Sequence, residues 1–330
     1  MRTTSARFLF RVAAGPRIGF GHLMRCRALA RALGIRPLVS IRGGAAARRT
    51  ATSLGCEVAD RRSWRDTDIL VVDDPSPRHA QAWLLRAARA GRPSATIHDL
   101  GIGSHAADLI VDGSVNARPS RQGGAALFGP RFAVLDPRVI QARAWRRHRL
   151  SAHRRVLIAL GGGAHVFSVV RSLVQDIARR CPGASIAVVA GFAGHARPRI
   201  GAARWIDRRD GLARELAASD VAVVGGGLTL YEACAIGVPA VAIAVAASQR
   251  PTVEAFAARR AAIDAGSLSH KAIAVSRAGA AVARLLREPS ARRRSSSAGR
   301  HLVDGQGALR VAARFRRLAV ASAARGSRRV

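Results

Sequence analysis

Short apolar runs typical of buried β-strands alternate with helical segments along the chain, and this alternation limits the fold more than any other feature. Strands that are each followed by a helix favour parallel sheets covered by helices. The runs that predict strands in the first half are Phe8–Val12, Pro37–Ile41, Asp68–Val72, Ala95–His98 and Leu109–Val111. Those in the second half are Arg155–Leu160, Ser185–Ala190, Val221–Val224 and Ala240–Ala244. The sequence therefore predicts an α/β fold of parallel layers.

Helical patterns fill the spaces between these runs. The predicted helices are Arg25–Leu33, Gln81–Ala90, Val166–Arg180, Leu212–Ala218, Thr229–Ile236, Val253–Arg260 and Ala308–Val320. No unit of about 20 to 50 residues recurs, which excludes a solenoid.

The length of 330 residues favours two domains, since a domain takes roughly 100–200 residues. The segment Asp136–His153 is rich in Arg and His, contains Pro137 and separates the two series of strands. We therefore expect an N-terminal Rossmann-like domain over residues 1–150 and a C-terminal one over 151–330. The latter ends in an Arg-rich tail, whose last residues, Gly326–Val330, we expect to be disordered.

The charge is strongly positive, with 55 Lys and Arg against 20 Asp and Glu, a net +35. A basic surface attracts nucleic acid, anionic membranes or phosphate-bearing substrates, but a general preference for arginine in the proteome would produce the same balance. The arginines are spread along the chain, and aromatic residues make up only 4% of it. Without interleaved aromatics for base stacking, a nucleic-acid partner is not expected.

The four cysteines are far apart and form no C-x-x-C pair, so neither a zinc site nor a disulfide framework is expected. No acidic cluster suggests a magnesium site, and we predict neither metal nor cofactor. Arg7 and Arg11 interrupt the N-terminal apolar run, which argues against a signal peptide. The longest apolar stretch, Val238–Ala247, is too short to span a bilayer. A cytoplasmic protein without membrane insertion is expected; the oligomeric state stays open, with a monomer favoured.

A glycine-rich turn, Gly19-Phe20-Gly21-His22, follows the first strand and leads into a helix. Glycines let the backbone approach a ligand closely, and a helix start offers N–H groups to an anion. His22 would then face the carboxyl edge of the sheet, where ligands bind in open α/β folds. A capping or surface histidine is the equally weighted alternative.

Two further glycine turns follow strands of the second half. They are Leu160-Gly161-Gly162-Gly163 and Gly225-Gly226-Gly227-Leu228-Thr229. In the second of these turns, the N–H groups of Gly227, Leu228 and Thr229 form a candidate cradle for a diphosphate. Glu232, one turn into the helix, is placed to hold a ribose diol, or else to stabilise the helix dipole.

Several stretches, in order from about residue 7 to about 313, resemble those of a known family. They are Arg11 with Ile18–Cys26, Ile69–Asp73, Asp99-Leu100, His105–Asp108, Leu127–Leu135, Leu160–Gly163, Gly227–Glu232, Gly237–Pro239, Gln249 and Val303–Ala308. The chain resembles the UDP-sugar hydrolases of pseudaminic acid biosynthesis, whose substrate is UDP-2,4-diacetamido-2,4,6-trideoxy-β-L-altropyranose. These are relatives of the peptidoglycan UDP-GlcNAc transferase and share its fold of two Rossmann domains, GT-B.

The resemblance implies metal-independent removal of UDP by water attack at the anomeric carbon. His22 matches the family's catalytic histidine, and the nucleotide would lie at the Gly227 turn. The substrate-binding residues implied by the turns and the resemblance together are Arg11, Gly19, Gly21, Arg25, Asp73, Gly162, Gly227, Leu228, Thr229, Glu232 and Gln249. The C-terminal helix is expected to return to the first domain, as in related folds.

Departures from the family pattern fall mostly on the first domain. They are Ala13, Phe20, Pro75, His98, His165 and Ser248. Two activities therefore stay open: a UDP-sugar hydrolase, in which water attacks the sugar, and a glycosyltransferase, in which a sugar hydroxyl attacks instead. A polyanion-binding protein would account for the charge but leaves the glycine turns and His22 unexplained.

Overall fold

The chain forms two compact units, and the second is inserted into the first. The computed structural model describes residues 6–16, 18–60, 62–98, 106–118, 125–147, 154–161, 166–191, 199–201, 203–207 and 211–326. One unit comprises Met1–Pro137 with Gln306–Val330, and the other comprises Arg138–Gly305. The division thus lies at Pro137 instead of near residue 150, and the C-terminal helix belongs to the first unit. The arginine-rich segment that resembles a linker contains helix α4 (Arg138–Arg147) of the second unit.

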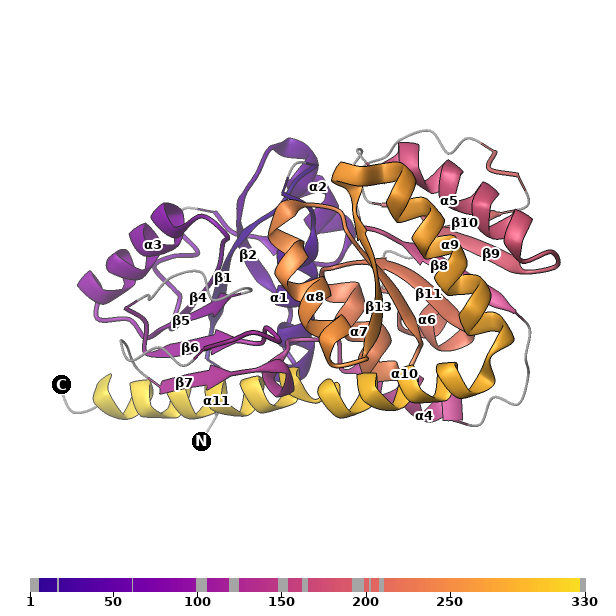
Figure 1. The fold of residues 1–330 in the computed structure, drawn as a ribbon. Coiled ribbons are helices and arrows are strands. Elements are labelled where there is room, and N and C mark those ends of the chain that lie inside the picture. The colour runs from indigo at the N-terminus through magenta and orange to yellow at the C-terminus, as the bar shows by residue number, and fades with distance from the viewer. Residues whose placement is uncertain are drawn as a thin grey trace. The chain divides into compact units, whose positions relative to one another are not determined.

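The first unit is built on a seven-stranded parallel sheet, as the alternating pattern predicts (Figure 1). Its strands are β1 (Phe8–Ala13), β2 (Leu38–Arg42), β3 (Glu57–Val58), β4 (Ile69–Asp73), β5 (Ser94–His98), β6 (Leu109–Asp112) and β7 (Ala125–Phe128). They are ordered β3-β2-β1-β4-β5-β6-β7. The order reverses between β1 and β4, and ligands of open α/β sheets bind at such a switch point, outside the carboxyl ends of the strands.

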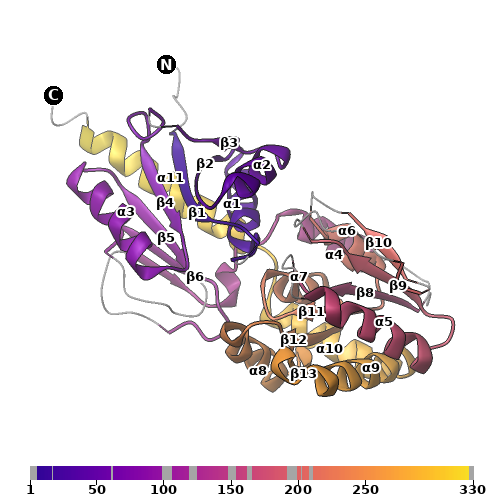
Figure 2. The same ribbon diagram turned by 90° about the horizontal axis from the view of Figure 1, so that it is seen from above.

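Helices cover both faces of this sheet (Figure 2). They are α1 (Gly21–Leu33), α2 (Ala45–Ser53), α3 (Pro77–Arg89), the 3₁₀ helix η1 (Pro130–Phe132) and α11 (Gly307–Gly326). Right-handed crossovers run from β1 toward one edge and from β4 toward the other, so α1 and α3 lie on opposite faces. The face toward α3 buries Leu9, Leu70 and Leu84 in one cluster.

Helix α11 packs on the first unit although it follows the second unit in the chain (Figures 1 and 2). Phe315 is fully buried, with its ring 6.0 Å from that of Phe8 on β1. Arg316 donates to the carbonyl of Ala32 at the end of α1, at 2.9 Å. The return of this helix, implied by the resemblance, is therefore confirmed. Residues 327–330 lie outside the described part of the chain.

The second unit has a six-stranded parallel sheet ordered β10-β9-β8-β11-β12-β13. Its strands are β8 (Arg155–Ala159), β9 (Ser185–Val189), β10 (Arg204–Ile206), β11 (Val221–Gly225), β12 (Ala240–Ala244) and β13 (Ala262–Ser267). Its helices are α4, α5 (Phe167–Arg180), α6 (Ala213–Ala218), α7 (Leu228–Ile236), α8 (Arg250–Ala258), α9 (Lys271–Arg287) and α10 (Pro289–Leu302), with short 3₁₀ turns at Ala247–Gln249 and Leu268–His270.

Two helices, α4 and α10, are absent from the set predicted from the sequence, and both are held by specific contacts. In α4, Arg146 donates to the carbonyl of Ala217 in the last turn of α6, at 2.9 Å, and to that of Gly237 just beyond the end of α7, at 3.2 Å. In α10, a side chain at Gly299 would come within 3.1 Å of the backbone of Cys234, so glycine permits close packing on α7. No helix in the described ranges is long and apolar enough to cross a membrane.

Removing the Phe315 ring tests the contribution of α11. We expect Phe315→Ala to lower the free energy of unfolding of the first unit by about 3–5 kcal/mol, because it opens a cavity in a packed core. Urea unfolding followed by the fluorescence of Trp64 and Trp83, both in this unit, measures the change. Arg314→Ala, at the exposed neighbouring position, should change it by less than about 0.5 kcal/mol. Equal effects of the two substitutions would contradict the packing.

Candidate functional site

The first glycine turn positions the start of α1. Gly15 and Gly19 exchange backbone hydrogen bonds at 3.1 and 2.7 Å, which close the loop after β1 on itself. Gly19 has a φ of 86°, a conformation that favours glycine. The helix begins at Gly21, so His22 lies on its first turn, at the carboxyl edge of the sheet.

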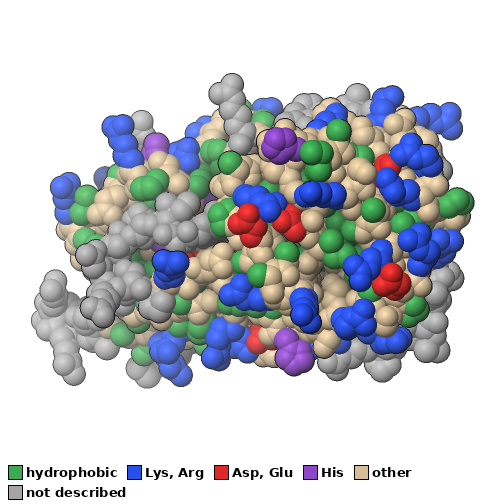
Figure 3. Space-filling model, viewed as in Figure 1, with side chains coloured by type: hydrophobic (Ala, Val, Ile, Leu, Met, Phe, Trp, Pro, Cys, Tyr) green, Lys and Arg blue, Asp and Glu red, His purple; other side chains and the backbone are tan. Residues whose placement is uncertain are grey.

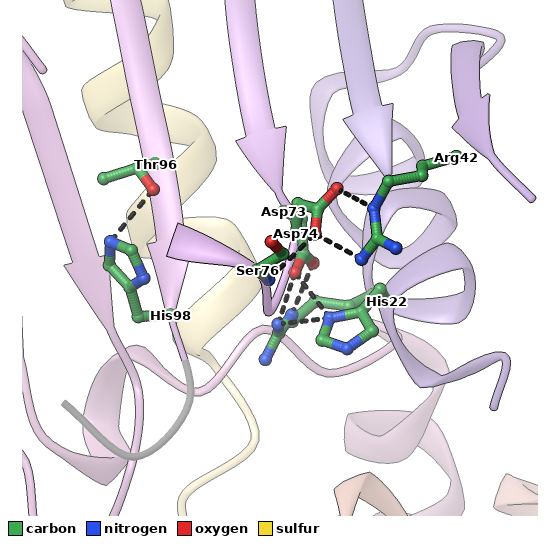
Figure 4. A network of polar contacts seen from close by, with 8 residues as sticks. His22, Arg42, Asp73, Asp74, Ser76, Thr96 and His98 are labelled. Atoms are coloured by element: carbon green, nitrogen blue, oxygen red, sulfur yellow. Dashed lines mark hydrogen bonds and ion pairs between the residues drawn. The ribbon is translucent and has the colours of Figure 1, made fainter. Parts of the chain in front are cut away.

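His22, Arg25 and Asp73 form one hydrogen-bonded group (Figure 4). Asp73, the last residue of β4, places Oδ1 2.7 Å from His22 Nδ1. Arg25 lies one turn along α1 and binds both carboxylate oxygens, Nε to Oδ2 at 2.7 Å and Nη2 to Oδ1 at 2.6 Å. The predicted residues His22, Arg25 and Asp73 are therefore brought together by the β4 end and the α1 start.

Asp73 is ionised in the folded protein. Burial by itself raises the pKa of a carboxyl group. The charges of Arg25 and His22 and their hydrogen bonds outweigh burial and hold the pKa of Asp73 far below its ordinary value. A carboxylate facing Nδ1 fixes the proton on that nitrogen. Nε2 of His22 is then the ring nitrogen that can accept a proton, and the side chain is 16% exposed.

Arg25 and Arg11, both predicted to bind substrate, contact other side chains of the first unit. The Arg25 side chain is 7% exposed, and its guanidinium binds Asp73 while its Nη2 also lies 3.1 Å from His22 Nδ1. Arg11 donates to Ser40 on β2 at 3.1 Å and lies over the ring of Trp83 on α3, 5.1 Å from its centre. Since α3 covers the face opposite α1, the structure does not bring Arg11 into the His22 group.

Three polar residues near this edge are absent from the predicted site. Asp74 directly follows Asp73 and accepts from Arg42 Nε and Nη2, both at 2.7 Å. His98, at the end of β5, lies 2.9 Å from the hydroxyl of Thr96 through Nε2 (Figure 4). Their signal in the sequence was their position directly after or at the end of a predicted strand, where side chains gather at one edge.

In the second unit, Gln249 connects two loops at the carboxyl edge of the sheet. Its Oε1 accepts from the N–H of Gly226 after β11, at 2.9 Å, and from that of Val245 after β12, at 3.2 Å. A side chain at Gly226 would come within 2.8 Å of Val253 and 2.9 Å of Gln249 Cβ. The glycine therefore allows the loop to lie directly on Gln249 and α8.

The start of α7 has the features of an anion site. Gly227 is its N-cap, and no side chain caps the helix there. The first N–H groups of a helix have no partner within it and carry its positive dipole end. Leu228, Thr229 and Glu232 are half-buried on the first turns. Gly162, also predicted to bind substrate, lies outside the described residues.

The described residues contain no group of three or more His, Cys, Asp or Glu side chains arranged to hold a metal ion. On the face drawn in Figure 3, Lys and Arg side chains are scattered over the surface and do not form one continuous patch. The chemistry of the two edges is thus that of a histidine–carboxylate pair in one unit and of backbone N–H donors in the other.

Comparison with known proteins extends this description. No family model matches the chain. The spore coat polysaccharide biosynthesis protein SpsG of Bacillus subtilis (strain 168) is 28% identical over 222 residues, which cover 62% of this chain and 63% of that protein. The chain thus spans less than two thirds of the length of this relative.

Solved structures match over most of the chain. MurG of Acinetobacter baumannii has a TM-score of 0.63 at 14% identity, covering 94% of this chain and 100% of that one. The spinosyn rhamnosyltransferase SpnG, complexed with thymidine diphosphate, has a TM-score of 0.63 at 17% identity, covering 94% and 99%. The fold is that of the GT-B glycosyltransferases. The fold predicted from the sequence is confirmed.

Replacing Asp73 tests the buried ion pair. Asp73→Asn leaves the Arg25 guanidinium buried without its counter-charge, so we expect the free energy of unfolding to fall by about 3–5 kcal/mol at pH 7. The folded pKa of Asp73 lies below its unfolded value of about 3.9. The carboxylate therefore stabilises the fold fully above that unfolded pKa and loses this contribution as the pH falls through the folded pKa.

The difference between wild type and Asp73→Asn should consequently shrink below about pH 4. Urea unfolding at several pH values measures it. Asp66→Asn is the control, because the Asp66 side chain is 57% exposed, and it should change stability by less than about 0.5 kcal/mol. A difference that stays constant with pH would show that the charge of Asp73 is not what matters.

The two glycines before α7 offer a matched pair. We expect Gly226→Ala to destabilise the second unit by about 1–3 kcal/mol, because the added Cβ overpacks against Val253 and Gln249. At Gly227 the Cβ would lie 3.7 Å from Gln249 Nε2, an ordinary contact, so Gly227→Ala should cost less than about 1 kcal/mol. Thermal unfolding of both variants measures this. A larger loss of stability in Gly227→Ala than in Gly226→Ala would contradict the close packing at Gly226.

Proposed function

We propose that the protein transfers a sugar from a UDP-sugar to a hydroxyl group of an acceptor in polysaccharide biosynthesis. The observation that carries this proposal is the His22–Asp73 pair, held by Arg25 at the carboxyl edge of the first sheet. A histidine on a buried carboxylate is a suitable general base at neutral pH.

His22 acts on the attacking hydroxyl. Its Nε2 accepts the hydroxyl proton while the oxygen forms a bond to the anomeric carbon, and the bond from that carbon to the diphosphate oxygen breaks. Asp73 fixes the tautomer and orientation of the ring and stabilises the cation that forms. Arg25 is a positioning residue, since it holds both oxygens of Asp73 in place.

The second unit binds the donor. The N–H groups of Gly227, Leu228 and Thr229 at the start of α7 bind the diphosphate and stabilise its charge as it leaves. Gln249 fixes the loop that precedes them, and Glu232 binds the ribose. The thymidine diphosphate in the SpnG complex supports a nucleoside diphosphate as the leaving group, and the SpsG name supports a role in polysaccharide synthesis.

Hydrolysis of the UDP-linked altropyranose in pseudaminic acid biosynthesis is the second candidate. The stretch around His22 that resembles the hydrolases favours it, because the same pair can activate water. However, the residues that depart from that family, Ala13, Phe20 and Pro75, lie beside the same edge. The relatives that support transfer make it the first candidate.

UDP release tests the function. Wild type and His22→Ala are supplied with UDP-GlcNAc or the altropyranose donor, first in water alone and then with sugar glycosides as acceptors. We expect His22→Ala to lower UDP release by about 100-fold or more, the usual contribution of a general base. His270→Ala, an exposed histidine in the second unit, is the matched control and should keep the wild-type rate.

The outcomes separate the candidates. Release that depends on an added acceptor supports transfer, and release in water alone at an undiminished rate supports hydrolysis. If His22→Ala and His270→Ala behave alike, His22 is not the base. If calorimetry also detects no UDP binding, the nucleotide-sugar proposal is wrong.

A further inference from the structure

A second polar group lies on the face of the first sheet that packs on α3. Arg11 on β1 pairs in register with Ser40 on β2 and with Val72 on β4. Arg42 lies two residues beyond Ser40, and Asp74 two residues beyond Val72. Side chains two residues apart in a strand share a face, so the three charged groups gather near the carboxyl edge. Figure 4 shows Arg42 and Asp74 beside the His22 group.

Asp74, the only carboxylate among these three charged residues, already accepts hydrogen bonds from other groups. Asp74 accepts two hydrogen bonds from Arg42 at 2.7 Å and one from the N–H of Ser76 at 2.9 Å. Its side chain is fully buried. The Arg42–Asp74 pair is therefore neutral as a unit, and Asp74 has little capacity left for a second guanidinium.

Arg11 is that second guanidinium. Nη1 donates to Ser40, but Nε is buried and has no hydrogen-bond partner among the described residues. Burial lowers the pKa of Arg11, and the nearby charge of Arg42 lowers it further, while Asp74 partly offsets both. A buried N–H without an acceptor is costly, and a charged one more so. The side chain thus retains a strong, unused capacity to bind an anion.

Aromatic rings hold Arg11 in place. Its guanidinium lies over Trp83, which contacts Trp64 edge to face at 5.7 Å between ring centres. Arg86 lies over both rings, 4.5 Å from the centre of Trp64 and 5.0 Å from that of Trp83. Such stacking fixes the plane of a guanidinium without neutralising it. Arg11 is therefore a pre-positioned cation beside the proposed catalytic edge.

We propose that Arg11 binds an oxyanion carried by the acceptor, either a carboxylate or a phosphate group. A planar guanidinium presents parallel N–H groups that match both anions. The assignment to the acceptor rests on the proposed function, since the donor diphosphate is assigned to α7 in the other unit. Binding of an oxyanion at Arg11 does not depend on that assignment.

Tryptophan fluorescence tests the site directly. In a Trp145→Phe/Trp205→Phe protein, the emission comes from Trp83, which lies against Arg11, and from Trp64, which contacts Trp83. Inorganic phosphate and glucuronate are titrated at constant ionic strength, with sodium chloride as the control for general salt effects. We expect saturable changes with at least one of the two, and the stronger binder distinguishes a phosphate-bearing from a carboxylate-bearing acceptor.

Variants in the same background show whether Arg11 is responsible. Arg11→Gln should weaken binding by about tenfold to a hundredfold, the contribution of a charge-assisted hydrogen bond. Arg11→Lys keeps the charge but loses the planar donor pair, and should weaken it by about three- to tenfold. Arg78→Gln, at an exposed position of α3, should bind as the parent does.

Several results would overturn the proposal: a chloride response equal to that of phosphate, an Arg11→Lys protein that binds as tightly as the parent, or an equal loss in Arg78→Gln. Arg11→Lys keeps the test decisive if Arg11→Gln does not fold. UDP binding by calorimetry is measured on the same proteins. If the parent protein does not bind UDP, the proposed function alone is contradicted. If the parent protein shows no fluorescence response to either anion, the anion site alone is contradicted.

Discussion

The ionised carboxylate of Asp73 is the interaction on which the first unit's edge depends. Burial opposes a charge at this position, so the charge persists only because Arg25 binds both oxygens and His22 adds a further hydrogen bond. The same contacts tie the end of β4 to the first turn of α1. A single side chain thus joins strand to helix and also fixes which nitrogen of His22 can accept a proton.

In the second unit, neutral groups join the elements at the carboxyl edge of the sheet. The amide oxygen of Gln249 accepts hydrogen bonds from two loops, and the absence of a side chain at Gly226 lets those loops approach. At the start of α7, no side chain of the described residues caps the backbone N–H groups. In the proposed function, the first edge supplies a proton acceptor and the second stabilises negative charge.

Periodicity and glycine turns predicted the parallel sheets, most helices and the place of His22 at the sheet edge, because these follow from local patterns, whereas Asp73 was implied only by the family resemblance. The boundary near residue 150 was misplaced because the charged composition of α4 hides the contacts that Arg146 makes with distant carbonyls. Helix α10 was not among the predicted helices for a similar reason, since its small residues matter only against α7. The sequence also did not predict the surroundings of the Arg11 side chain, because the pattern of one strand does not specify which face of the sheet α3 covers.

The order of the chain has a consequence for synthesis. The apolar surface around Phe8 is completed by Phe315, yet the whole second unit is translated between them. At about 5–20 residues per second, translation of the second unit, Arg138–Gly305, alone takes roughly 8 to 34 s. During that time one face of the first sheet lacks its covering helix, and once Gly305 has been made the second unit has all of its own residues and can fold. The N-terminal half is thus the last to be completed, and chaperones that recognise exposed apolar surface have a defined period in which to bind it.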